Sequence, residues 1–242
     1  MRKGVRVPDG GLRIVHLTDL HLRGRRLHPA LIDLAAELRR DPPHLVLFTG
    51  DFNDDKFDSS DAAPIFEEAG HRFAGVATLG TYGIGGNHDG DLIAARLEAI
   101  GITPLDGKRA TLDQVDLLGV AGTDRLDAAG RAAVEDLDRD PAKPTIALSH
   151  FPDQICRLDR LSPDLVLSGH THGGQVCLPW AGRGGRPRPL ITHDSLPMRM
   201  SAGIHKYGDS WLVVSRGVGT TALPIRFFCP AEAVEITLVR AD

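Results

Sequence analysis

Short apolar runs, each ending in a polar loop, recur along the chain. They cover residues 13–17, 44–48, 76–85, 144–148 and 164–167. Continuous apolar character over so few residues is typical of strands that are buried on both faces. We predict a strand at each run, although glycines interrupt the pattern of the third.

Helical spacing of apolar residues appears between these runs. Residues 28–40 repeat leucine and alanine at intervals of three and four, and Asp41-Pro42-Pro43 stops the pattern. Asp91 is placed to cap a helix that runs through residues 93–100 and ends at Gly101. Two further helices are predicted over residues 62–69 and 128–137.

The second half of the chain adds more strands. They are predicted over residues 116–122, where the strand pairs with the short segment before it, 211–215 and 234–239. Residues 179–197 are rich in glycine, proline and arginine and predict a long loop. Strands that alternate with helices and then cluster predict an α/β core of mixed strand direction.

Composition limits the classes of function. The 242 residues predict a single domain over residues 1–242, and the net charge of −4 argues against broad binding to a nucleic-acid backbone. Three cysteines without paired spacing favour a reducing compartment. We find no secretory signal and no run near the roughly 18 apolar residues of a membrane-spanning helix. We therefore expect a cytoplasmic protein without a transmembrane segment.

Metal-binding residue types follow five of the predicted strands. Sites in α/β sheets form where the carboxyl ends of strands meet, and a histidine pair at i and i+2 on extended chain points to one side. The sequence therefore predicts a metal site at the C-terminal ends of the strands. The residues are Asp19 and His21, Asp51, Asn87 and His88, His150, and His170 with His172.

These blocks, in this order, resemble the calcineurin-like metallophosphoesterase superfamily. The matching motifs are Asp19-x-His21, Gly50-Asp51-x-x-Asp54, Gly86-Asn87-His88-Asp89, His150 and Gly169-His170-x-His172. The stretches 173–179, 215–219 and 224–227 are similar to its bacterial YkuE-like branch. The resemblance implies a four-layer αββα sandwich of two mixed β-sheets flanked by helices, with a two-metal centre.

The resemblance also implies a ligand set. Asp19, His21, Asp51 and His172 would hold one divalent ion, and Asp51, Asn87, His150 and His170 would hold the other, so that Asp51 bridges them. Mixed imidazole and oxygen ligands suit manganese, iron or zinc better than calcium or magnesium, and the choice among the three stays open.

The implied reaction is in-line attack of a metal-bridging hydroxide on phosphorus. His88 would be the general acid for the leaving group, and Asp54 would orient it. Two divalent ions, two aspartates and a hydroxide leave a net charge of about +1, which attracts an anionic ester. Asn87, His88, Arg23 and Arg186 are candidate substrate contacts, although a solvated loop is the alternative for both arginines.

We therefore expect a phosphohydrolase, most simply a phosphodiesterase, that acts on a small-molecule or lipid-linked phosphate ester and not on nucleic acid. The alternatives are a UDP-diacylglucosamine-type pyrophosphatase, a cyclic-nucleotide phosphodiesterase, or a catalytically silent metal-binding scaffold. Arg216 fits either an ion pair or a substrate contact. The apolar character of residues 223–228 favours burial in the core over contact with a lipid. Peripheral membrane contact is nevertheless left open.

Overall fold

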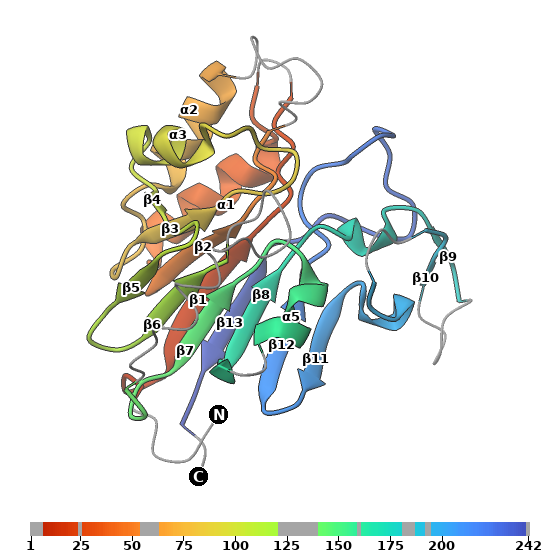
Figure 1. Ribbon diagram of the computed structural model, residues 1–242. Helices are drawn as coiled ribbons and strands as arrows, with labels where there is room; N and C mark the ends of the chain where they lie inside the picture. The colour runs from red at the N-terminus through yellow and green to blue at the C-terminus, as the bar shows by residue number, and fades with distance from the viewer. Residues whose placement is uncertain are drawn as a thin grey trace.

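Two β-sheets lie face to face in the computed structural model, which describes residues 7–23, 26–53, 63–120, 140–158, 161–180, 187–191 and 195–240 (Figure 1). The first sheet has the strand order β13-β1-β2-β3-β4. Its inner pairs are parallel, whereas β13 runs antiparallel to β1. The bounds are β1 Leu12–Leu17, β2 Leu45–Thr49, β3 Thr81–Ile84, β4 Thr103–Pro104 and β13 Val234–Leu238.

The second sheet has the order β11-β12-β8-β7-β6-β5. Its four central strands are parallel, and the two outer strands are antiparallel to their neighbours. The bounds are β5 Arg109–Thr111, β6 Asp116–Gly119, β7 Thr145–Leu148, β8 Leu165–Ser168, β11 Gly203–Tyr207 and β12 Ser210–Val214. A separate pair joins β9 Cys177–Leu178 to β10 Arg188–Pro189.

Helices cover the outer face of each sheet. One hydrophobic cluster packs Val46 and Phe48 of the first sheet against the helices α1 Pro29–Arg40, α2 Ala63–Phe73 and α3 Ile93–Ala99. Another packs Val166 and Leu212 of the second sheet against α5 Ile155–Leu158. Three single 3₁₀ turns complete the described elements: η2 Pro152–Gln154, η4 His172–Gly174 and η6 Met198–Met200.

A third cluster fills the space between the sheets and joins Ile14 and Leu47 to Leu117 and Leu148. Successive side chains of a strand point to opposite faces, so both faces of β2 are buried. This explains why the central strands read as unbroken apolar runs. The predicted αββα sandwich of two mixed β-sheets is confirmed.

Several predicted boundaries are wrong. Residues 76–80 precede β3 as a loop, in which Thr78 and Leu79 donate backbone hydrogen bonds to Pro43 and His44 instead of to a strand. The helix α3 begins after Leu92 without a side-chain cap, so Asp91 does not cap it. β10 interrupts the predicted loop over residues 179–197. The predicted helix over residues 128–137 lies outside the described residues.

The prediction that residues 223–228 are buried is also wrong. Leu223, Ile225, Phe227 and Phe228 are 56%, 55%, 52% and 44% exposed. Phe227 forms an isolated parallel bridge with Val176, next to β9, and neither sheet includes the segment. The amide of Cys177 donates to the carbonyl oxygen of Phe227 at 2.9 Å. In the part of the chain that the structure describes, no helix is long and apolar enough to cross a membrane.

Candidate metal centre

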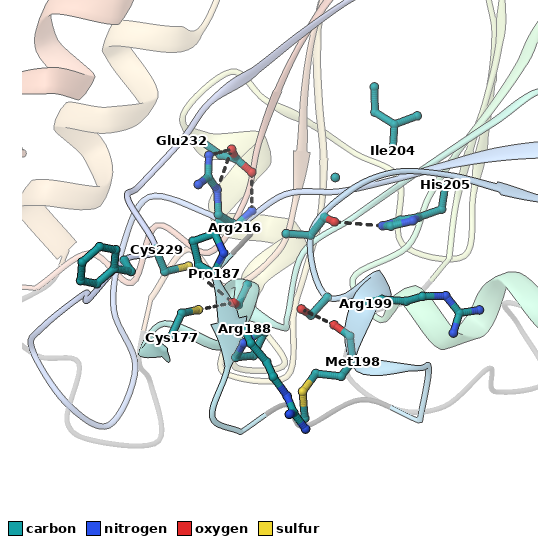
Figure 2. Close-up of a pocket in the computed structure, with 16 residues that line it drawn as sticks. Cys177, Pro187, Arg188, Met198, Arg199, Ile204, His205, Arg216, Cys229 and Glu232 are labelled. Carbon is teal, nitrogen blue, oxygen red and sulfur yellow. Dashed lines mark hydrogen bonds and ion pairs between the residues drawn. The ribbon is translucent and has the colours of Figure 1, made fainter. Parts of the chain in front are cut away.

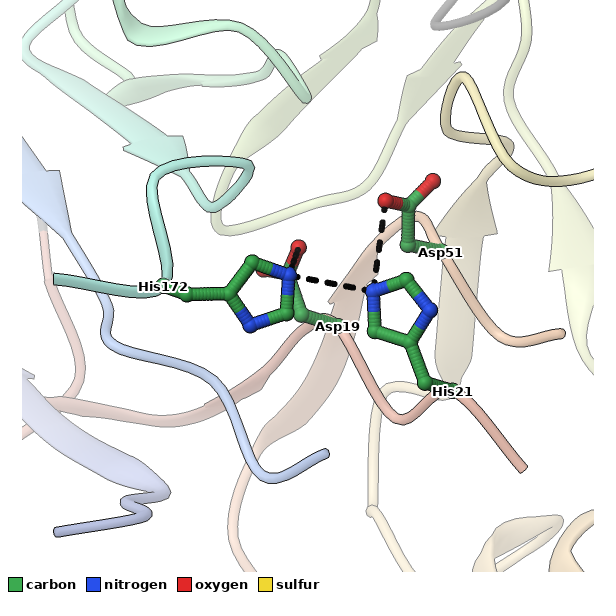
Figure 3. Close-up of side chains that lie close together, drawn as sticks. All are labelled: Asp19, His21, Asp51 and His172. Carbon is green, nitrogen blue, oxygen red and sulfur yellow. Dashed lines mark hydrogen bonds and ion pairs between the residues drawn. The ribbon is translucent and has the colours of Figure 1, made fainter. Parts of the chain in front are cut away.

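Four buried side chains from three strand ends meet at one point. Asp19, His21, Asp51 and His172 place one ligand atom each within 4.8 Å of one another (Figure 3). The Nε2 atoms of His21 and His172 are 3.1 Å apart. His172 Nε2 lies 3.4 Å from Asp19 Oδ1, and His21 Nε2 lies 3.5 Å from Asp51 Oδ2.

A second group of ligand atoms adjoins the first. Asn87 Oδ1 lies 3.0 Å from His150 Nε2 and 2.8 Å from His170 Nδ1. His150 Nε2 also lies 3.3 Å from Asp51 Oδ2. The same carboxylate oxygen of Asp51 therefore faces both groups, as a bridging ligand would.

The spacing of these atoms fits divalent ions. Metal–ligand bonds of about 2.0–2.2 Å place neighbouring ligand atoms about 2.8–3.6 Å apart in tetrahedral or octahedral geometry. The observed separations of 2.8 Å to 3.5 Å fall in this range. The donor set of carboxylates, imidazoles and one amide oxygen is also chemically suitable.

All these residues follow the carboxyl ends of strands in the two sheets. Asp19 follows β1, Asp51 follows β2, and Asn87 follows β3. The second sheet supplies His150 after β7, and His170 and His172 after β8. The loops at the carboxyl ends of both sheets therefore contribute ligands to one centre.

The geometric reason that we gave for the histidine pair is wrong. Thr171, between His170 and His172, has φ −75° and ψ −17°, which is helical and not extended. The two histidines have left-handed φ values of 67° and 50°. Their rings consequently reach different groups, His170 the amide of Asn87 and His172 the carboxylate of Asp19.

Further hydrogen bonds orient the ligands. His150 Nδ1 lies 2.7 Å from the carbonyl oxygen of Thr49, to which it must donate, so Nε2 keeps its lone pair for a metal. The amide of His88 donates to Asp51 Oδ1 at 2.8 Å, which leaves Oδ2 to face both groups. The amide of His170 donates to Asp19 Oδ2 at 3.0 Å.

Burial and charge shift the pKa values in this cluster. Burial alone lowers the pKa of His150, but the carboxylate of Asp51 outweighs it and raises that pKa to about 9. Burial opposes ionisation of Asp51, yet His150 and His21 hold its pKa below the usual value. The pair therefore binds a proton where a divalent cation could bind instead.

Comparison with known proteins identifies the family. The model of the calcineurin-like phosphoesterase family matches residues 12–174, which include every proposed ligand. The chain belongs to the calcineurin-like phosphoesterase family. An uncharacterized metallophosphoesterase of Helicobacter pylori is 30% identical over 96% of this chain, and the chain spans 60% of that relative's length.

Two further relatives match more of their own length. The uncharacterized metallophosphoesterase YkuE of Bacillus subtilis is 29% identical over 96% of this chain and 81% of its own. Phosphodiesterase YaeI of Escherichia coli is 30% identical over 94% of this chain and 82% of its own. The crystal structure of TT1561 of Thermus thermophilus shares the fold, with a TM-score of 0.53, 16% identity, and coverage of 84% of this chain and 88% of that one.

The calcineurin-like site has a partly exposed histidine at its edge. His88 is half-buried, and its ring centroid lies 5.0 Å from that of His21. Arg23 is exposed two residues after His21. Asp54 and Arg186, the other predicted site residues, lie outside the described residues.

Asp89 has a role that we did not predict. Its Oδ1 accepts from the amide of Asn53 at 3.0 Å and its Oδ2 from the amide of Gly86 at 2.8 Å. The carboxyl group thereby joins the loops after β2 and β3. Burial, with a contribution from Asp51, raises its pKa to about 7. Its place directly after Gly86-Asn87-His88 was the available signal.

Two arginines secure the C-terminal loop, and one of them also contacts a proposed ligand. Arg216 forms an ion pair with Glu232, which decides between the two predicted alternatives. Arg226 donates to the carbonyl oxygens of Arg216 at 2.7 Å and His172 at 3.3 Å. The guanidinium of Arg226 also lies 3.4 Å from Nδ1 of His172, so it ties this loop to a proposed ligand. The likeness of residues 224–227 to the YkuE-like branch was the available signal.

Proposed function

We propose that the protein is a phosphodiesterase that hydrolyses phosphate esters with the help of two divalent ions. The observation that carries the proposal is the convergence of two groups of ligand atoms on Asp51 Oδ2. The fold of the calcineurin-like phosphoesterases and the likeness to a relative named as a phosphodiesterase support the same activity.

The side chains have distinct tasks in this proposal. When bound, the ions would supply an activated water at neutral pH and offset the charge of the phosphate. Asp51, oriented by the amide of His88, would keep the two ions together. Asn87 and His88 would contact the ester, and His88 would hold the proton that the leaving oxygen takes up. Manganese, iron and zinc all suit the donor set.

Several classes of phosphate ester fit the same site. A small-molecule or lipid-linked phosphate ester fits, and a UDP-diacylglucosamine-type pyrophosphatase or a cyclic-nucleotide phosphodiesterase would use the same groups. A cytoplasmic location is part of the proposal and is supported by three free cysteines. A silent scaffold is the alternative from another class.

Hydrolysis of two chromogenic esters tests the proposal. The protein is stripped of metal, resupplied with Mn²⁺, Fe²⁺, Zn²⁺ or Mg²⁺, and assayed with p-nitrophenyl phosphate and bis-p-nitrophenyl phosphate. We expect metal-dependent turnover that favours the diester and is lost in Asp51→Asn. Preference for the monoester would refute a phosphodiesterase, and two bound ions without turnover of either ester would support the scaffold.

A further inference from the structure

Exposed apolar side chains gather in two chain segments next to His172, one that follows it in sequence and one that Arg226 ties to it. Eight large apolar side chains in two chain segments are between 44% and 75% exposed. We call the surface that they form the apolar rim. Its members are Leu178, Trp180, Leu190, Ile191, Leu223, Ile225, Phe227 and Phe228.

Contacts between the two segments make the rim one surface. The ring centroids of Trp180 and Phe228 are 5.9 Å apart, and those of Phe227 and Phe228 are 4.7 Å apart. Leu178 is paired with Arg188 across the strands β9 and β10. Patches of aromatic and aliphatic side chains of this kind mark interaction surfaces.

The backbone beneath the rim is held firmly. The side-chain amide of Gln175 donates to the carbonyl oxygens of Thr221 at 3.0 Å and Leu223 at 2.9 Å, and its Oε1 accepts from the amide of Thr221 at 2.8 Å. Gln175 is 8% exposed, so water competes little for these bonds. The exposed side chains therefore project from a fixed support.

A positively charged cavity adjoins the rim. The cavity, shown in Figure 2, has a volume of about 840 Å³. Phe228 lines the cavity and is also a member of the rim. Three arginines and one glutamate line it, namely Arg188, Arg199, Arg216 and Glu232. Glu232 is paired with Arg216, as Figure 2 shows, so the lining has two positive charges in surplus.

Arg188 and Arg199 supply that surplus. Both are exposed, and neither guanidinium group makes an ion pair or hydrogen bond with another residue in the described part of the chain. No acidic residue occurs in the described residues of segments 174–191 and 221–228. This local charge is opposite to the net charge of −4 of the whole chain.

We propose that the apolar rim and the adjacent cavity form a docking surface for anionic phospholipid bilayers. Tryptophan, phenylalanine and leucine side chains enter the boundary between headgroups and acyl chains, and arginines bind lipid phosphates. A second copy of the chain is a poorer occupant, because a two-fold contact through the rim would bring two positive cavities together. The docking surface is independent of the metals, although it would bring the proposed phosphodiesterase to lipid-linked esters.

Vesicle co-sedimentation of the full chain tests the proposal. We expect binding to vesicles of phosphatidylcholine with phosphatidylglycerol, weak binding to phosphatidylcholine alone, and release by salt. The double variant Trp180→Ser with Phe227→Ser should lower the partition coefficient at least tenfold, since both side chains would lose burial in the bilayer. Val239→Ser, at a position after β13 that is 60% exposed, is the control and should bind normally.

Three further measurements keep the test decisive. In a Trp211→Phe background, the fluorescence of Trp180 should shift to the blue with anionic vesicles, and Arg188→Glu should weaken binding. The rim variant should keep its hydrolysis of bis-p-nitrophenyl phosphate, which also shows that it is folded. Should it be unfolded, Trp180→Ser alone replaces it and should weaken binding in the same direction.

The opposing results are equally clear. Absence of binding to anionic vesicles, or unchanged binding of the rim variant, would overturn the proposal. A dimer that the rim substitutions dissociate, without vesicle binding, would assign the rim to self-association instead. Vesicle binding by a chain that hydrolyses no ester would refute the phosphodiesterase and leave the docking surface standing.

Discussion

Five residues at the metal centre have left-handed backbone angles. Their φ values are 50° at Asp19, 41° at His21, 53° at Asp51, 67° at His170 and 50° at His172. Such angles cost about 1–3 kcal/mol each for residues other than glycine and persist only where surrounding contacts enforce them. The orientation of the ligand atoms toward common points therefore lowers the stability of the fold at the strand ends.

At the same scale, His88 can be separated from the metal ligands. Its imidazole lies beside His21 at the edge of the cluster, while its amide supports Asp51 through the backbone. His88→Ala keeps that amide, so we expect metal content by elemental analysis to stay unchanged. Turnover of bis-p-nitrophenyl phosphate should fall about 10²–10⁴-fold. Loss of metal in this variant would contradict the role as proton donor.

Asp89 supplies the next test at a single residue. Asp89→Ala leaves the amides of Asn53 and Gly86 without their acceptor, so we expect a loss of about 2–4 kcal/mol in the free energy of unfolding. Asp89→Asn keeps an acceptor oxygen and should lose less. Urea denaturation of the three proteins measures the order. Unchanged stability in Asp89→Ala would show that the carboxylate does not hold the two loops.

Between elements, glycines allow the loops to approach closely. A Cβ atom on Gly169 would lie 2.2 Å from Asp19 Oδ2 and 2.1 Å from Thr18 Oγ1. At Gly83, inside β3, the nearest atoms to a Cβ would be 3.4 Å away, which is an ordinary contact. The absence of a side chain at Gly169 thus allows the loop after β8 to lie close to the loop after β1.

These two glycines form a matched pair. Gly169→Ala should displace the carboxylate of Asp19 and weaken metal binding about 10–100-fold, the usual effect of disturbing the support of a ligand. Gly83→Ala should bind metal as the unchanged protein does. Titration calorimetry with Mn²⁺ measures both affinities. Unaltered affinity in Gly169→Ala would mean that the loops relax freely.

The strand β1 carries a buried histidine that links folding to pH. His16 is fully buried, its Nε2 lies 2.8 Å from Thr49 Oγ1, and burial lowers its pKa to about 4. The unfolded chain takes up this proton below the ordinary pKa of 6.5, whereas the folded chain does not. Protons therefore favour unfolding, and stability is lost as pH falls from 6.5 toward 4.

A substitution isolates this effect. His16 should contribute a loss of about 3 kcal/mol in the free energy of unfolding over that interval. His16→Gln cannot titrate, so its stability should fall less steeply between pH 6.5 and about 4. Urea denaturation at several pH values compares the slopes. Parallel slopes would place the pH dependence in other groups.

The apolar pattern of the sequence predicted some strands and missed others. β2 and β8 were predicted because burial on both faces leaves an unbroken apolar run. β4 and β11 were missed, since β4 has two residues and β11 is mostly exposed, so neither shows such a run. The positions of the ligand blocks after strands predicted a metal site, and the family resemblance implied that Asp51 is the common ligand. The left-handed turns that aim His170 and His172 leave no pattern of their own.

At the scale of the molecule, the metal centre joins the two sheets. The first sheet provides Asp19, His21, Asp51 and Asn87, and the second provides His150, His170 and His172. Each proposed ion would therefore take ligands from both sheets. We therefore expect the two sheets to separate and the ions to dissociate in the same unfolding transition.

Thermal unfolding with and without metal tests this coupling. At a free ion concentration of about 100 times the dissociation constant, each bound ion should add about 2.7 kcal/mol to the free energy of unfolding. The midpoint temperature should rise accordingly with Mn²⁺. The increment should shrink strongly in Asp51→Asn, whatever the stability of that variant without metal. An equal rise in both proteins would place the ions elsewhere.

The edge of the first sheet has a consequence for synthesis on the ribosome. β13 pairs with β1 from Leu12 to His16, so strands about 220 residues apart in sequence must meet. All the ligands have been translated by His172, long before Val234. Until β13 has been translated, the nascent chain exposes the unpaired edge of β1, which is a template for association with other chains. Chaperone protection should matter most during translation of the last third of the sequence.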